Sequence, residues 1–140
     1  DEPIRRPFTR VAPAFVPLAV SIWLAHYGFH FATGALSIIP VFQSFLLDHG
    51  VTLLGEEPNW LRGPILPGGW LLPLQTLIVV IGFAASLYVA NTVATRKHGP
   101  GSAAIREALP WDIVFLGLAA AALLTFNLPM EMRGTVFLGG

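Results

Sequence analysis

Four polar residues, His26, His30, Thr33 and Ser37, recur at helical spacing within the apolar residues 15–39. Spacings of three and four residues place these side chains on one face of a helix. The length and apolar content of the segment predict that it spans a membrane. Ionisable side chains are costly in hydrocarbon, so we expect this face to point at protein, a cofactor or trapped water.

The two imidazoles of this face have three possible roles. His26 and His30 are four residues apart, so together they suit one metal ion such as copper or zinc. Alternatively, each is the axial ligand of a separate haem or chlorophyll-type pigment. They cannot be the opposite ligands of one haem, because they share a face. In the third interpretation each neutral imidazole forms a hydrogen bond with a neighbouring helix and binds no cofactor.

Two methionines near the C-terminus extend the metal hypothesis. Met130 and Met132 flank Glu131 just after the last apolar stretch. Thioethers suit copper(I), so we predict a copper-handling corner if these residues lie beside the histidines. The alternative is an interfacial apolar pair with a surface carboxylate.

The composition is that of an integral membrane protein. The chain has 140 residues, 54% hydrophobic and 11% charged, with a mean hydropathy of +0.68. Soluble domains carry about 25% charged residues. There is no cysteine, which excludes disulfides and iron–sulfur ligands in this chain. The net charge is zero, so the chain lacks the excess of positive charge that is typical of nucleic-acid-binding proteins. No catalytic motif is visible, so we expect no enzyme activity.

Three apolar stretches predict an all-α membrane domain over residues 1–140, with helices at about 13–39, 70–95 and 109–128. Residues 41–48 are short and mixed, which predicts an interfacial helix on the membrane surface. An outer loop is expected over residues 48–69, which contain several Pro and Gly. Pro110 is expected in the first turn of the third helix, where a missing amide costs least.

The distribution of basic residues predicts the orientation. They gather before the first span and between the second and third, at Arg5, Arg6, Arg10, Arg96, Lys97 and Arg106. The positive-inside rule therefore predicts a cytoplasmic N-terminus and a periplasmic C-terminus in a bacterial inner membrane.

Small residues four apart predict close helix packing, because they let backbones approach one another in lipid. The set comprises Gly28, Ala32, Gly82, Ser86, Ala90, Gly117 and Ala121.

Several polar residues near the span ends have simpler expected roles. Asp112 suits a helix N-terminus, and Asn127 suits an interhelical hydrogen bond. His49 and His98 are expected in loops without partners.

Three stretches resemble one family of membrane proteins. They are WLAHYGFHFATGAL at residues 23–36, IPVFQS at residues 39–44 and LPMEMRGT at residues 128–135. Together they resemble the C-terminal membrane portion of bacterial polyferredoxin-type proteins, similar to the nitrous-oxide-reductase regulator and the cytochrome oxidase accessory ferredoxin. The resemblance implies a cysteine-rich cytoplasmic part with two [4Fe–4S] clusters, attached before Asp1, and candidate functional positions at His26 and His30.

Two functions follow as expectations. The first is a membrane anchor or accessory subunit of a bacterial bioenergetic redox complex, which supports electron transfer or cofactor placement. The second is a purely structural small subunit of a photosynthetic or respiratory complex, which fills a gap between helices and contacts lipid or pigment. A transporter is not expected, because three helices are too few for a fold built from repeats.

Overall fold

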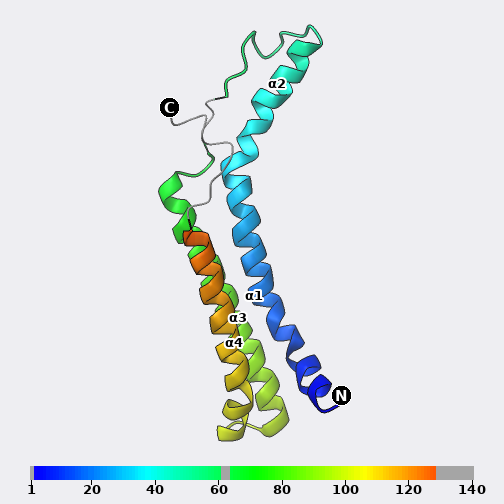
Figure 1. Cartoon of the computed structure of the whole chain (residues 1–140), viewed down its shortest axis with the longest axis vertical. Helices are drawn as coiled ribbons and strands as arrows, with labels where there is room; N and C mark the ends of the chain where they lie inside the picture. Colours follow the sequence, from blue (N-terminus) through cyan, green and yellow to red (C-terminus); the bar gives the residue numbers. More distant parts are fainter. Residues whose placement is uncertain (1, 61–63, 129–140) are drawn as a thin grey trace.

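The computed structural model describes residues 2–60 and 64–128, with side chains from Phe8 onward, and these residues form helices joined by loops (Figure 1). The elements are α1 (Glu2–Gly34), the 3-10 turn η1 (Ala35–Ser37), α2 (Ile38–Asp48), α3 (Gly68–His98) and α4 (Ser102–Asn127). Three helical segments are long and apolar enough to cross a membrane: Phe8–Asp48, Gly68–His98 and Ser102–Asn127. The prediction of an all-α, three-span membrane protein is therefore confirmed, and its helices contact lipid.

The first span is longer than expected. α1 begins at Glu2 rather than near residue 13, because the polar residues before the apolar stretch continue the same helix. At its other end η1 leads directly into α2, which begins three residues before the predicted interfacial helix. In Figure 1, α2 continues the course of α1 past the ends of α3 and α4. α1, η1 and α2 thus form one rod, called here the long rod.

α4 also begins earlier than expected, at Ser102. Pro110 therefore lies inside the helix and not in its first turn, which corrects the sequence prediction. The preceding residues 103–108 include three alanines, which favour helix formation enough to extend it ahead of the proline. A proline within a helix leaves one carbonyl without its usual amide donor.

α3 packs against both α1 and α4, whereas α1 and α4 contact each other much less. Leu18, Val79 and Phe115 are fully buried where the three helices meet. Phe15 of α1 packs edge-on against Phe115 of α4, with ring centroids 4.8 Å apart, and also edge-on against Trp111 at 6.2 Å. Such aromatic pairs add to the burial that holds α1 and α4 together.

The backbones of α1 and α3 approach each other closely at Gly82. Gly82 is buried, and a Cβ atom added to it would overlap the Ser21 side chain and lie 2.9 Å from the Pro17 carbonyl oxygen. Ser86 and Ala90 continue this buried face of α3. Small residues therefore let α3 approach α1 more closely than larger side chains would allow.

Candidate functional site

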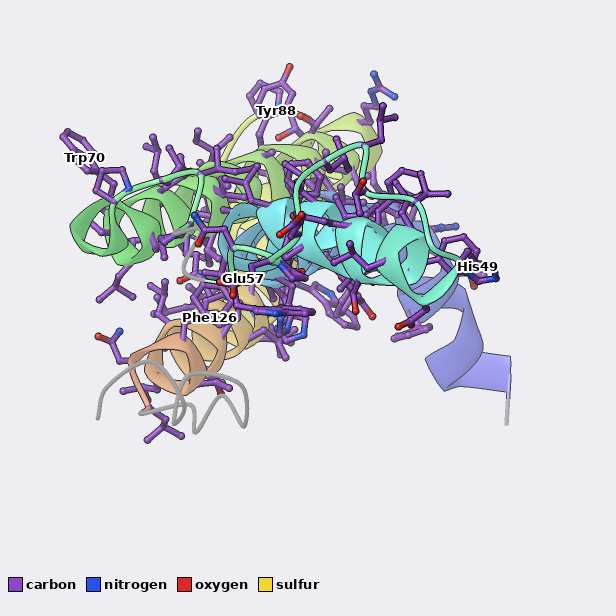
Figure 2. The ribbon with its side chains drawn as sticks, turned by 90° about the horizontal axis from the view of Figure 1, so that it is seen from above. His49, Glu57, Trp70, Tyr88 and Phe126 are labelled. Carbon is purple, nitrogen blue, oxygen red and sulfur yellow. The ribbon has the colours of Figure 1, made fainter. Side chains whose placement is uncertain are left out.

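The two histidines of α1 lie side by side toward the end of α1 that leads into α2. The rings of His26 and His30 are perpendicular, with centroids 4.7 Å apart. The His26 ring lies parallel to Phe126 of α4, with centroids 6.5 Å apart. Figure 2 views the molecule from this end and labels Phe126 on α4. His26 is half-buried and His30 is exposed, so His30 faces the surroundings of the chain.

The hydroxyls that continue the polar face bond to their own helix. The Thr33 hydroxyl donates to the Phe29 carbonyl oxygen at 2.9 Å, and the Ser37 hydroxyl donates to that of Gly34 at 2.6 Å. Such bonds to the preceding turn satisfy a hydroxyl without any ligand. The possible ligand-binding groups of the face are therefore the two imidazoles.

The histidine pair supplies only part of a metal site. Within residues 2–60 and 64–128, no group of three or more His, Cys, Asp or Glu side chains is placed to hold a metal ion. Structural zinc takes four ligands, and copper sites commonly take at least three. Met130 and Met132, the other predicted metal ligands, lie outside the described residues. A metal bound by His26 and His30 would need ligands from beyond the described part of the chain.

Gln75 of α3 is a buried polar residue that the sequence analysis missed. Its Nε2 donates to the carbonyl oxygen of Ala25 at 3.2 Å, one residue before His26. Gln75 lines a cavity of ≈ 190 Å³ together with Phe29, Phe126 and Leu128. The imidazoles of His26 and His30 are not in the wall of this cavity. An amide within an apolar stretch was the signal that could have identified this contact.

Two further polar contacts join the helices. The Leu18 backbone amide donates to Ser86 Oγ at 3.0 Å, next to Pro17. On the other side of α3, Asn91 Nδ2 donates to Asp112 Oδ2 at 3.1 Å and to the Leu87 carbonyl oxygen at 2.9 Å. Asp112 therefore receives a hydrogen bond from α3, and its position inside α4 corrects the predicted place at the helix N-terminus.

Charges gather where α3 turns into α4. Lys97 Nζ lies 2.7 Å from Glu107 Oε2, and the His98 ring also bonds to Glu107. His98 is the last residue of α3, so the prediction of a loop histidine without a partner is wrong. Exposed ion pairs of this kind contribute little stability.

Two other sequence predictions also change. His49 Nδ1 lies 2.8 Å from the Phe45 carbonyl oxygen, so His49 does have a partner. Asn127 Nδ2 donates to the Leu123 carbonyl oxygen of its own helix at 2.8 Å, not to a neighbouring helix. Such a bond to the preceding turn satisfies the side-chain amide within its own helix.

The small residues divide into two groups. Gly82, Ser86, Ala90 and Ala32 are buried, as is expected of packing positions. Gly28 is partly exposed, and Gly117 and Ala121 are exposed. A Cβ added to Gly28 or Gly117 would meet nothing within 4 Å. α4 turns Phe115 and Ala119 inward instead, so Gly117 and Ala121 mediate no close packing among the described residues.

No protein-family model, curated protein or solved structure matches this chain.

Proposed function

We propose that this chain is a membrane anchor or accessory subunit of a bacterial bioenergetic redox complex, in which it supports electron transfer or cofactor placement. The observation that carries the proposal is the exposed His30 beside the half-buried His26. Histidines within apolar spans are uncommon and mark functional positions by default. An exposed imidazole on such a span gains from a partner that supplies a ligand or a hydrogen bond.

The lipid-exposed surface supports a role inside an assembly. In an 18-residue apolar stretch of each span, only 28% of the first span's stretch, 28% of the second's and 17% of the third's are buried within the chain. Large side chains such as Trp70 and Tyr88 project outward from α3 (Figure 2). The remaining surface is free for lipid and for neighbouring membrane subunits.

The resemblance to polyferredoxin-type membrane proteins supports the redox part of the proposal. In that family the clusters lie in a cysteine-rich cytoplasmic part, and this chain has no cysteine. The chain would then serve as the membrane portion, with its N-terminus cytoplasmic by the positive-inside rule. On the outer side, His26 and His30 would bind one copper ion together, with further ligands from a partner. Alternatively, each would be the axial ligand of a separate haem or chlorophyll-type pigment.

The test is purification from native membranes in mild detergent, followed by metal analysis, visible absorbance and identification of co-purifying polypeptides. We expect a redox complex carrying a metal or chromophore. The variants H26Q and H30Q should lose that cofactor, whereas H49Q should retain it, because His49 lies at the end of α2 away from the pair. A chain that purifies without redox subunits and without a cofactor would contradict the proposal.

A second candidate function is a purely structural subunit of a photosynthetic or respiratory complex. The large exposed apolar surface favours it equally. It predicts co-purification with a large complex whose cofactor content does not change in H26Q and H30Q.

A further inference from the structure

The long rod carries an exposed row of residues at regular alternating spacing of four and three. The row comprises Val20, Leu24, Tyr27, Phe31, Gly34, Ile38, Val41 and Phe45. Every member is exposed, and Phe31 and Ile38 are 68% and 69% exposed. The alternation is the heptad pattern with which two helices pack along a shared seam. We call this row the outer seam.

The same rod already uses such a pattern to bind α3. The buried residues of α1 include Val11, Ala14, Leu18, Ser21, Ala25 and Ala32. Of these, Leu18, Ser21 and Ala25 contact α3. The buried residues too are three, four or seven residues apart, which is the spacing of a helix-pairing face. Each residue advances an α-helix by about 100°, and the outer seam begins one residue before Ser21. The outer seam therefore lies about 100° around the helix from the buried face that packs against α3. The rod thus has two pairing faces, of which α3 covers one.

Cavities beside the outer seam widen this face. A cavity of ≈ 310 Å³ lies between α1 and α3, with Val20, Leu24 and Ile81 in its wall. A second cavity of ≈ 230 Å³ shares Leu24 and reaches Gly28. A helix lying along the outer seam would place its side chains into this groove, as ridges pack into grooves between helices.

Lipid tails cannot cover the whole outer seam. Val20 is adjacent to Ser21, which packs against Gly82 near the middle of the apolar residues 70–95. If this contact lies at mid-membrane, half of a hydrocarbon core about 30 Å thick extends about 15 Å to either side, which is the length of about ten helical residues. The rod from Phe31 to Phe45 then extends about 21 Å past the edge of the hydrocarbon core. Tilting cannot bury this part of the rod, because a helix as long as Phe8–Asp48 would need a tilt above the usual limit of about 40°.

We propose that the outer seam binds the outer seam of a second copy of this chain, as a parallel pair of rods in register. Copies of one sequence insert with the same orientation, so a two-fold axis along the membrane normal makes the pair parallel. The seam contains no Asp, Glu, Lys, Arg or His between Val20 and Phe45, so two copies do not repel one another there. Gly34 lies within the seam and lets the two backbones approach closely.

The available surface suits a stable pair. An aromatic side chain carries about 150–250 Å². The seam offers three aromatic and four aliphatic side chains that are each about half or more exposed, which amounts to several hundred Å² per copy. A stable interface buries about 800 Å² per partner, and the groove walls add to the seam.

Residues 1–140 contain no cysteine, so cysteines introduced along the rod can be tested directly in membranes. Single-cysteine variants along the rod are oxidised, and the fraction of disulfide-linked dimer is measured. We expect F31C, G34C, I38C and V41C to form dimers at twice the mass of the chain. L36C, on the opposite side of the rod, and I113C, on exposed α4, should remain monomeric. Equal cross-linking at all positions, cross-linking to a different polypeptide or no dimer at all would overturn the proposal.

A substitution at Gly34 tests the same contact without cysteine. A Cβ at Gly34 would meet nothing within 4 Å in the single chain, so G34L should leave the monomer folded. It should lower the dimer fraction about tenfold or more, because a large side chain overfills a close crossing. G117L is the matched control, since Gly117 is equally unobstructed on α4. A dimer unaffected by G34L would contradict the inference. Since the assay reads self-association only, its result is independent of whether His26 and His30 bind a cofactor.

Discussion

Gly82 of α3 faces Ser21 of α1 with no room for a side chain between them. This contact lies at the centre of the α1–α3 packing, beside the Pro17 carbonyl oxygen. The two helices can keep this distance only while residue 82 is glycine.

We therefore expect G82A to destabilise the folded chain. Its Cβ would overlap the Ser21 side chain and would lie 2.9 Å from the Pro17 carbonyl oxygen, so the backbones must separate. Overpacking of this kind costs about 1–3 kcal/mol. The free energy of unfolding, measured by denaturant titration in detergent micelles, checks the loss.

The control for this prediction is G117A, which adds the same methyl group where nothing lies within 4 Å. It should leave the unfolding free energy unchanged or slightly raised, because alanine favours helix more than glycine. Replacing Ser21 by glycine in the G82A background should recover part of the loss. Equal stabilities of G82A and G117A would show that the contact is not tight.

Ser86 Oγ accepts a hydrogen bond from the Leu18 backbone amide. This bond explains why a hydroxyl is buried in the α1–α3 interface. In S86A the amide loses its acceptor on α3, which costs about 1–3 kcal/mol for a buried group. We expect a lower unfolding free energy and faster hydrogen exchange at the Leu18 amide. T92V is a suitable comparison, because the Thr92 hydroxyl donates to the Tyr88 carbonyl oxygen of its own helix and not to α1. Unchanged exchange at Leu18 would argue against this bond.

The hydrogen bond from Asn91 to Asp112 joins α3 to α4. An asparagine at position 112 keeps an oxygen that can accept from Asn91, so D112N should retain near-natural stability. D112L removes the acceptor and leaves the Asn91 amide with only the Leu87 carbonyl oxygen. Interhelical hydrogen bonds in membranes contribute about 0.6–2 kcal/mol to the free energy of unfolding. We therefore expect D112L to lower the free energy of unfolding by an amount in this range. A thermal unfolding series in detergent distinguishes the two variants, and identical melting temperatures would refute the prediction.

Gln43 holds the loop after α2 against the rod. Its buried Nε2 donates to the carbonyl oxygens of Leu54, Gly55 and Glu57 at 2.8, 3.2 and 3.1 Å. In Q43L these carbonyls lose their donor, so the loop should open more often while the spans remain folded. Limited proteolysis with an enzyme specific for glutamate reports this directly, because the peptide bond after Glu56 lies in the loop. We expect several-fold faster cleavage than in the natural chain or in S44A, and equal rates would rule out the role of Gln43.

The number of spans and the all-α class could be predicted from the sequence alone. Both follow from the length and apolar content of each segment, which are local properties. The spacing of His26 and His30 also sufficed to place both rings on one face, because helix geometry is regular.

Which helix faces would meet was decided by the tertiary structure. Gly82 and Gly117 occur in similar small-residue patterns, yet only Gly82 is buried against another helix. Lipid and protein neighbours are both apolar in a membrane, so hydropathy does not distinguish a packed face from a lipid-facing one. For the same reason the sequence does not predict that Gln75 bonds to the Ala25 carbonyl oxygen or that Ser86 bonds to the Leu18 amide. Both bonds depend on how α1 packs against α3.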